Sequence, residues 1–566
     1  MRRTEHQECE YHAWNPGIST ELPSALLKLE TLYRPPYTST EFDELQELTR
    51  LTGIKQERLV AFTPERLVLH ELIIRITADI LVEEGPEEEM LGQRFRQIAQ
   101  KILAQYIAPS LQKLEDCFNT LQQEVEQQVR DILQQTLFQP IQAGNRKPQA
   151  KGFFKRFRRR QNQLLPSIEE QQYKIIKQFK ESGLQTNLPY DKALYKSLYV
   201  VLSAMATTSG RIIHNPELLT TLIRRQMCND YGSRLIGQML DPIIRRAISQ
   251  EGYKTVLPTE KPLLISLKGA SASGKSTLRP LLREVIQQQG IESESFGTIS
   301  PDIWRRLLLD YDALGPHYKY AGRLTSNEVN IIDRKLDRYI RAKAQQDRSI
   351  PYLIVDRFRF DSFTTKQIAK ILHGTYASYV DTMHMYFIIT PPEATVERGW
   401  QRGLERGRYK SVEDFLGHSV EAYSGMPKLF FKWLAYDKPV FRFSFMDNSV
   451  AKGELPLTVA WGSQQELNII DPMALINIER YQKINIYAAC EAEVYPHGKL
   501  LDVSNNCGFL QQCITRLPRV NFLTAAESEP YLIIEGKQKR ILNASQLNAL
   551  RNSAELDSLF SILLNN

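Results

Sequence analysis

The sequence lacks long hydrophobic runs. Its 566 residues contain no stretch of about 18 apolar residues, the length that a membrane-spanning helix needs. The first residues, MRRTEHQECEYHAW, also lack the apolar core of a cleavable secretory signal peptide. We therefore expect a cytoplasmic protein without membrane spans. Delivery into another cell by a route that needs no N-terminal signal stays open.

The chain also has few cysteines and a small net charge. The six cysteines are scattered and no two have C-x-x-C spacing, so neither a zinc site nor a disulfide framework is indicated. The net charge of +7 is small for this length and does not by itself indicate nucleic-acid binding. With 42% hydrophobic and 24% charged residues, the composition predicts packed cores, and the length predicts several domains.

One stretch organises the rest of the chain. Residues 261–278 read KPLLISLKGASASGKSTL, in which a short apolar run is followed by the phosphate-binding pattern G-x-x-x-x-G-K-[ST] and then by a helical pattern. A buried strand, a glycine-containing turn and a helix are the context that a nucleotide site requires. Gly269 and Gly274 would let the backbone turn tightly and approach a ligand closely.

The loop and the start of its helix predict a site for ATP or GTP with Mg²⁺. Lys275 would contact the β- and γ-phosphates, and Ser276 would place its hydroxyl on Mg²⁺. The backbone N–H groups of the loop would point at the phosphates. The predicted nucleotide-binding residues are Gly269, Ala270, Ser271, Ala272, Ser273, Gly274, Lys275, Ser276 and Thr277.

The predicted fold class is multidomain. We expect a mainly α-helical N-terminal half, a central α/β P-loop domain with a parallel sheet covered on both faces, and a small α+β C-terminal domain. The expected boundaries are a helical domain at 1–140, a basic linker at 141–165, a helical region at 166–255, the P-loop domain at 256–450 and the C-terminal domain at 451–566. In the last, strands are expected at 459–470 and 484–487, and a hairpin within 531–542.

The N-terminal half has two notable features. Apolar residues recur at three- and four-residue spacing from Leu111 to Ile132, which predicts a helix that Pro109 should break or kink. It would be a bundle helix or a coiled coil for self-association. The segment Lys151–Arg160 is basic with interleaved phenylalanines, which suits an anionic membrane surface or a solvated linker. No base-reading motif accompanies it, so there is no strong nucleic-acid signal.

Polar residues follow the predicted strands of the central domain, where ligands bind to such sheets. Asp302 follows the second strand and could accept the proton of an attacking hydroxyl, or could simply belong to a helix start. Asp356 ends the third strand and could bind Mg²⁺ through water, or could form a salt bridge with Arg357 or Arg359. Four arginines follow the fourth strand and are expected to form a lid over the phosphate cleft whose charge neutralises a transferring phosphoryl group: Arg398, Arg402, Arg406 and Arg408. Their alternative is an exposed helix with glutamate partners.

Five segments resemble, in order, the zeta-toxin family of P-loop kinases over about residues 261–447. They are Gly269–Thr277, SPDIWRRLL, RLTSNEVN, LIVDRFRFDSF and the arginine segment. The family phosphorylates a hydroxyl of UDP-N-acetylglucosamine with ATP or GTP. The resemblance implies that Asp302 is the catalytic base, that Glu328 holds the sugar nucleotide, and that Arg398 and either Arg406 or Arg408 clamp phosphate. Arg357 or Arg359 would contact the substrate. The segment VDRFRFDSF departs from the family's small Gly/Thr-rich turn and would reshape the acceptor pocket.

The sequence therefore predicts a Mg²⁺- and ATP-dependent phosphotransferase that acts on a hydroxyl of a small molecule or another acceptor. A second hypothesis is a nucleotide-dependent switch or scaffold, such as a bacterial effector that acts on a host membrane or protein. A nucleic-acid end kinase is a third hypothesis, which would need a basic channel around the cleft.

Overall fold

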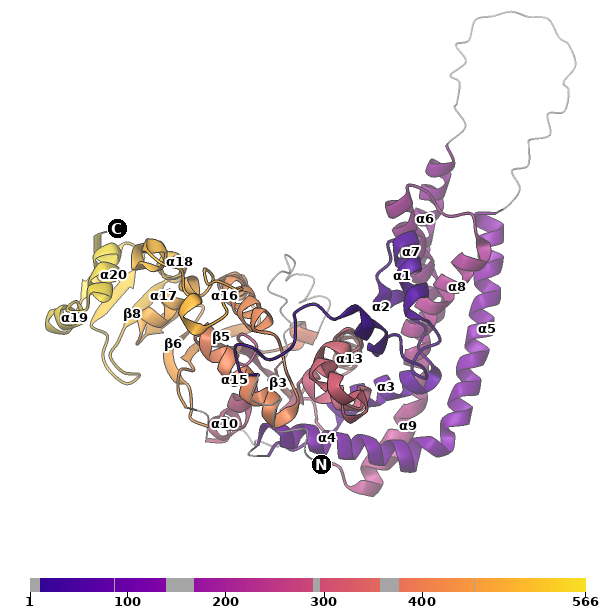
Figure 1. The fold of residues 1–566 in the computed structure, drawn as a ribbon, viewed down its shortest axis with the longest axis horizontal. Helices are drawn as coiled ribbons and strands as arrows, with labels where there is room; N and C mark the ends of the chain where they lie inside the picture. Colours follow the sequence, from indigo (N-terminus) through magenta and orange to yellow (C-terminus); the bar gives the residue numbers. More distant parts are fainter. Residues whose placement is uncertain are drawn as a thin grey trace, which may run out of the picture. The chain divides into compact units, whose positions relative to one another are not determined.

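The computed structural model describes residues 11–85, 87–138, 167–288, 296–356, 376–451 and 453–565 (Figure 1). The chain divides into two compact units, one of Met1–Leu27, Ile73–Lys101 and Ala247–Asn566, the other of Lys28–Leu72 and Ile102–Arg246. Both units combine stretches that are separated in the sequence, and the domain boundaries inferred from the sequence stay a prediction. The basic segment Lys151–Arg160, Arg357 and Arg359 lie outside the described residues. Among the helices that the structure describes, none is long and apolar enough to cross a membrane.

The unit of Lys28–Leu72 and Ile102–Arg246 is helical. Its helices are α1 (Phe42–Thr52), α2 (Gln56–Leu59), most of α3 (Pro64–Asp79), α5 (Leu111–Thr136), α6 (Ile168–Gln185), α7 (Pro189–Ser209), α8 (Pro216–Met227) and most of α9 (Ser233–Glu251). The expected break at Pro109 is present, since π-helical and 3₁₀ turns over residues 102–110 separate α4 (Glu88–Lys101) from α5. The apolar face of α5 is buried and α5 packs on α8 of the same chain, while self-association stays a prediction.

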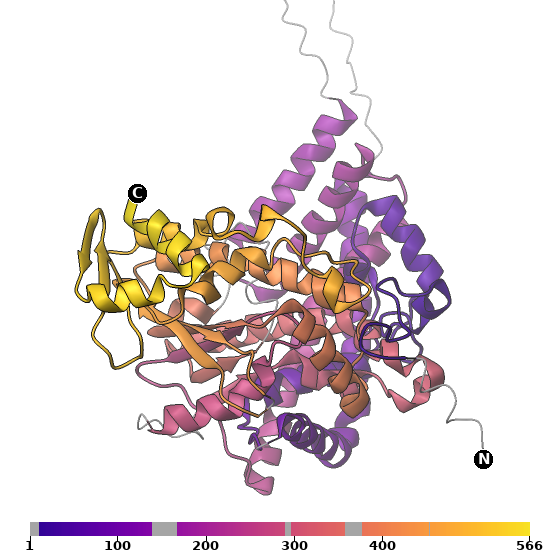
Figure 2. The ribbon, with the colours of Figure 1, turned by 60° about the vertical axis from the view of Figure 1, so that its left-hand side comes forward.

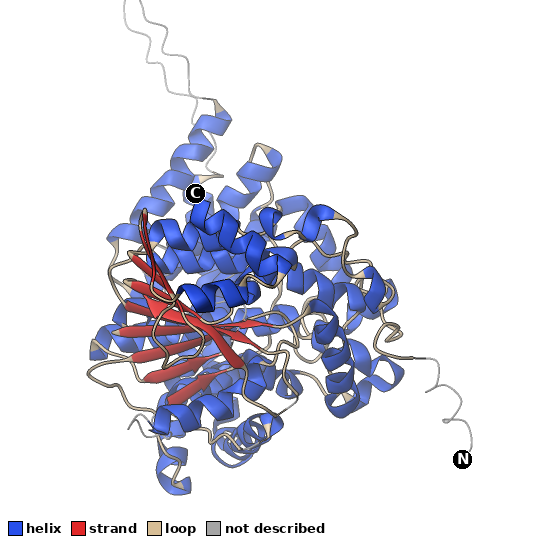
Figure 3. Ribbon diagram, turned by 90° about the vertical axis from the view of Figure 1, so that its left-hand side faces the viewer, coloured by secondary structure: helices blue, strands red, loops and turns tan. Residues whose placement is uncertain are grey.

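The other unit is built on one sheet whose strand order is β10-β9-β8-β7-β6-β5-β4-β1-β3-β2. Its first five strands along the chain run parallel to one another, as predicted: β1 (Leu263–Lys268), β2 (Phe296–Ile299), β3 (Tyr352–Val355), β4 (Thr382–Ile389) and β5 (Val440–Asp447). Helices cover both faces (Figure 3). Those in the described connections are α10 (Lys275–Gln288), α11 (Arg305–Leu308), α12 (Ala321–Leu324), α13 (Ser326–Asp347), α15 (Pro392–Arg406) and α16 (Val412–Leu434).

The C-terminal part continues this sheet. β6 (Leu457–Ser463) pairs antiparallel with β5, and β7 (Glu466–Ile469), β8 (Arg519–Phe522), β9 (Leu532–Glu535) and β10 (Gln538–Ile541) follow. Its helices are α17 (Pro472–Arg480), α18 (Gly508–Arg516), α19 (Ala544–Leu550) and α20 (Ala554–Asn565), seen in orange to yellow in Figure 2. The hairpin is β9–β10. The prediction of a strand at 484–487 is wrong, because this segment forms no strand and Ile484 and Ile486 instead pack with residues of α15 and α16.

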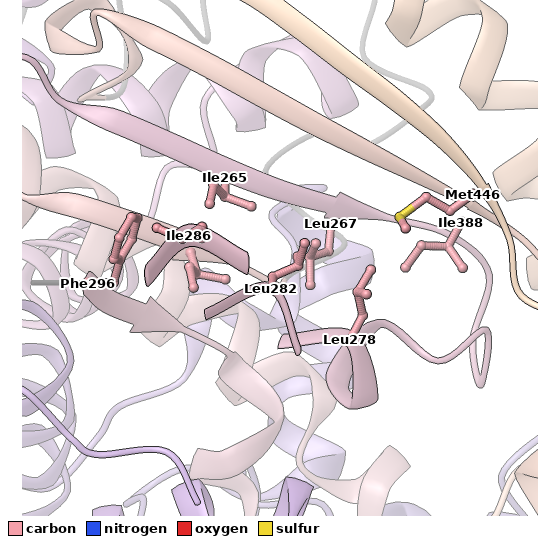
Figure 4. Close-up of a cluster of buried hydrophobic side chains, with 9 residues drawn as sticks. Ile265, Leu267, Leu278, Leu282, Ile286, Phe296, Ile388 and Met446 are labelled. Atoms are coloured by element: carbon pink, nitrogen blue, oxygen red, sulfur yellow. The ribbon is translucent and has the colours of Figure 1, made fainter. Parts of the chain in front are cut away.

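A cluster of buried hydrophobic side chains between the sheet and α10 anchors the phosphate loop (Figure 4). Ile265 and Leu267 of β1 face Leu278, Leu282 and Ile286 of α10, and neighbouring strands complete the cluster. Burying such side chains contributes roughly 1.5–3 kcal/mol each. The strand and the helix that flank the loop are therefore fixed against each other, and the loop has little freedom to change its path.

Candidate active site

The loop between β1 and α10 needs both of its pattern glycines. Gly274 has a φ of +89°, and a Cβ there would lie 2.1 Å from the Nδ2 atom of Asn448. A Cβ on Gly269 would lie 2.5 Å from the Oγ atom of Ser273 and 3.1 Å from a backbone oxygen of β4. A side chain at either position would require these neighbours to shift, and the φ of Gly274 is one that other residues rarely adopt. The glycine spacing therefore reflects a backbone that passes closely between its neighbours.

Two side chains beyond the pattern hold the loop in place. The Nδ2 atom of Asn448 donates to the Ser273 carbonyl at 2.8 Å, and the hydroxyl of Thr390 donates to the same oxygen at 3.2 Å. The Tyr423 hydroxyl in turn donates to the Thr390 carbonyl at 2.6 Å. The sequence analysis missed these residues. The available signal was their position, because Thr390 and Asn448 each directly follow a strand that neighbours or lies near β1.

Lys275 lies over the loop that it follows. Its Nζ atom donates to the carbonyls of Gly269 at 3.0 Å and Ala270 at 2.6 Å. Burial lowers the pKa of the ammonium to about 8, although Asp356 acts in the opposite direction. An anion at the loop would favour the charged form of Lys275, which is the role that the sequence predicts for this residue.

Ser276 and Asp356 lie together, as the metal prediction requires. The Ser276 hydroxyl donates to Oδ2 of Asp356 at 3.0 Å, and Nη1 of Arg279 lies 3.2 Å from the same oxygen. A hydroxyl and a carboxylate are hard oxygen donors of the kind that Mg²⁺ prefers. Among the described residues no three His, Cys, Asp or Glu side chains form a metal-binding group. The donors present thus fit a Mg²⁺ ion whose remaining ligands are phosphate and water.

A buried network of charged side chains packs against the Ser276–Asp356 pair. The Nε atoms of Arg279 and Arg283 each lie 3.6 Å from Oε1 of Glu84, and Arg283 also donates to the Thr298 hydroxyl at 2.8 Å. The side chains of Arg279 and Glu84 are 2% and 5% exposed. Buried charges persist only when they are paired, so Glu84 is needed to keep Arg279 beside Asp356.

Asp302 lies in a 3₁₀ turn (Pro301–Trp304) directly after β2. Arg305 donates from Nε to its Oδ1 atom at 2.8 Å, and Arg408 donates from Nη2 to its Oδ2 atom. Desolvation would raise the pKa of this carboxyl, but Arg408 and Arg305 hold it well below its usual range. Asp302 is therefore an anion at neutral pH, and it is paired with one of the predicted lid arginines.

The four predicted lid arginines do not all face one place. Arg406 and Arg408 line a pocket with Ser276 and Asp302. Arg402 is near enough to contribute to lowering the pKa values of Lys275 and Asp302. Arg398 instead donates from Nη2 to two backbone carbonyls after β5, those of Asn448 at 2.8 Å and Val450 at 2.9 Å. In this structure Arg398 supports the loop that holds Ser273, and the other three lie toward the cleft.

Glu328, the residue matched to sugar-nucleotide binding, lies in the first turn of α13 and is fully buried. It has no surface open to a ligand in this conformation. Arg305, which pairs with Asp302, also donates to the hydroxyl of Thr325, the residue before α13, at 2.8 Å. The structure thus links the start of α13 to Asp302, and the role of Glu328 in substrate binding stays a prediction.

Lys410 and His418 lie near the charged residues of the candidate site, and neither was among the predicted site residues. Nζ of Lys410 lies 3.1 Å from Nδ1 of His418. Burial, with help from the cation of Arg402, lowers the pKa of Lys410 to about 7. Burial and Lys410 lower the pKa of His418 to about 3. A signal existed for Lys410, because it ends the same basic segment as Arg408. His418 carried none, since it is an isolated histidine eight positions later in the chain.

Comparisons with known proteins give distant structural matches. No family model matches the sequence, and no curated protein matches it. The chain is similar to crystal structures of the AvrRxo1-ORF1:AvrRxo1-ORF2 complex. The one with sulphate ions is 15% identical over 46% of this chain and 77% of that chain, with a TM-score of 0.32. The one with ATP is 14% identical over 42% and 71%, with a TM-score of 0.29. Scores this low establish neither a common fold nor a common activity.

Proposed function

We propose that the protein is an ATP- and Mg²⁺-dependent phosphotransferase that moves a γ-phosphate to a hydroxyl of a small molecule. One observation carries the proposal. Ser276, at the phosphate end of the loop, lines the same pocket as the anionic Asp302 and the cations Arg406 and Arg408. Phosphoryl transfer needs these elements together, namely a phosphate cradle, a group that orients the acceptor hydroxyl, and positive charge around the transferred group.

The residues of the chain divide the work as follows. Backbone N–H groups of the loop and Lys275 bind the nucleotide phosphates. Ser276 and Asp356 would hold a Mg²⁺ ion, which neutralises phosphate charge when bound. Asp302 accepts a hydrogen bond from the acceptor hydroxyl and orients it toward the γ-phosphate. Because the pKa of Asp302 is low, orientation outweighs proton abstraction, which suits the loose transition state of this reaction.

The pairing of Asp302 with Arg408 suggests how the site becomes active. Without substrate, each neutralises the other. A γ-phosphate near Ser276 would compete for Arg408 and release one carboxylate oxygen of Asp302 for the acceptor. Arg402 and Arg406 would add charge where the phosphoryl group develops it.

The test follows label from γ-³²P-ATP into a small-molecule extract, with products separated by mass. Lys275→Ala should abolish transfer, and Asp302→Asn should reduce it by about 10²-fold because the acceptor hydroxyl is no longer held in place, with nucleotide binding retained in Asp302→Asn. Circular dichroism should show both variants folded. Transfer by Lys275→Ala at the wild-type rate would remove the enzyme proposal. A slow hydrolysis of ATP without transfer to any compound would favour a nucleotide-dependent switch instead.

A further inference from the structure

A helix from outside the predicted P-loop domain forms one wall of the cleft. The cleft is lined by Ser276 and Asp302 of the candidate site. α4 contributes Glu89, Gly92 and Arg96 to the same lining.

α4 lies against the Asp302 turn. A Cβ on Gly92 would lie 3.6 Å from the Cβ of Ile303, the residue after Asp302, which is ordinary van der Waals contact. Both helix and turn belong to the same compact unit. The side chains that α4 places in the cleft are therefore held next to Asp302 by direct packing.

Charged side chains outside the predicted lid also line the cleft. Nη2 of Arg96 lies 3.3 Å from Oε1 of Glu89, and both side chains remain partly exposed, at 19% and 34%. Arg306 belongs to the same lining, with its guanidinium 4.7 Å from the ring centre of Tyr311 and a hydrogen bond of 3.0 Å to the carbonyl of Arg406. The lining thus holds the guanidinium groups of Arg96 and Arg306, with Glu89 as the acid paired with Arg96.

We propose that α4 is the acceptor-recognition wall of the site, and that Arg96 binds an anionic substituent of the acceptor. The inference rests on the proposed function, because Arg96 and Asp302 line the same cleft, so an acceptor whose hydroxyl lies at Asp302 can contact α4 with another part of the molecule. Glu89 holds Arg96 in position until the anionic group displaces it. Arg306, which lies against the Tyr311 ring and lines the same cleft, contacts the same group. Arg96 is thus a specificity-determining residue.

Calorimetry on the full chain tests this assignment, with inorganic phosphate as the probe. A first titration saturates the protein with Mg²⁺ and a non-hydrolysable ATP analogue, and phosphate is then added. We expect one further phosphate to bind, and Arg96→Gln to weaken it by at least about tenfold, as the loss of a charge-assisted hydrogen bond would. Arg94→Gln is the matched control, since Arg94 lies on the same helix but pairs with Glu83.

A second variant separates recognition from support. Glu89→Gln removes the internal partner of Arg96 and should tighten phosphate binding by about threefold, whereas a purely structural pair would lose binding in both variants. The inference is overturned if the wild type binds no second phosphate, if Arg96→Gln binds as the wild type does, or if Glu89→Gln weakens binding. Failure of the ATP analogue to bind in the first titration would refute the proposed function. The difference between Arg96→Gln and Arg94→Gln would still report on α4.

Discussion

At the scale of single residues, the surroundings of Asp302 are crowded with positive charge. Lys275, Arg402, Arg408 and Lys410 gather near Asp302, and the two lysines have lowered pKa values because burial and their cationic neighbours disfavour the charged form. Such crowding is unfavourable until an anion arrives. A polyphosphate would offset this repulsion, so the arrangement of charges favours anionic ligands.

This arrangement predicts pH-dependent nucleotide binding through Lys410. Its pKa of about 7 is set by burial and by Arg402 and Arg408, against Asp302 and Asp414, and His418 stays neutral above a pH of about 3. Protonated Lys410 attracts phosphate, so binding takes up a proton and affinity falls as the pH rises above 7. The fall should approach tenfold per pH unit until the pKa of the complex is reached.

Titration calorimetry in buffers of different ionisation enthalpy at a pH of about 8 measures the proton uptake directly. Lys410→Arg is the control, because a guanidinium stays charged and should remove this proton from the balance. Equal uptake in the wild type and Lys410→Arg would show that Lys410 does not respond to the nucleotide.

At the scale of elements, the lid helix α15 is packed on two sides. Trp14 of the N-terminal segment donates to Glu397 at 2.9 Å, and the Tyr495 hydroxyl donates to Glu393 at 2.6 Å. Lys319 donates to the carbonyl of Pro16 at 2.9 Å and lies 5.9 Å from the ring centre of Trp400 on α15. Segments from both ends of the sequence therefore position the arginines of the lid.

The contact of α15 with α16 depends on a glycine. A Cβ on Gly399 would lie 2.1 Å from the ring of Phe415, so Gly399→Ala should force the helices apart and lower the free energy of unfolding by about 1–3 kcal/mol. Gly417 on α16 has open space around it, and Gly417→Ala should raise that free energy by about 0.5–1 kcal/mol. Urea denaturation of both variants compares them, and equal effects would contradict the close packing.

At the scale of the whole chain, the C-terminal part shares its core with the central strands. Phe509 of α18 lies 5.8 Å from the ring centres of both Phe430 and Phe445, in helix α16 and strand β5. β5 carries the Asn448 loop that holds Ser273. The C-terminal part is therefore continuous with the layer that forms the nucleotide site.

This continuity predicts that a distant substitution reaches the site. Phe509→Ala should lower the free energy of unfolding by about 3–5 kcal/mol. Denaturation followed by nucleotide binding and by circular dichroism should shift together. Tyr487 lies in the same part of the chain and is 73% exposed, so Tyr487→Ala should change the free energy of unfolding by less than about 0.5 kcal/mol. A separate, unshifted transition for nucleotide binding would show that the two parts unfold independently.

Local chemistry explains which features could be predicted. The strands β1 to β5, the phosphate loop and the Ser276–Asp356 contact follow from apolar runs and from glycine spacing, since each depends on residues close in sequence or on the shared edge of a parallel sheet. The placement of Arg398 could not be predicted, because four-residue spacing aligns side chains on one helix face without saying which neighbour each one meets.

The sequence by itself determined the phosphate loop and the parallel direction of the central strands, because those features depend on residues that are contiguous in the chain. Only the tertiary structure decided that α4 lines the cleft, that Arg408 pairs with Asp302, and that the C-terminal strands extend the same sheet. These contacts join residues up to hundreds of positions apart, and their partners are selected by packing and charge in three dimensions rather than by local pattern.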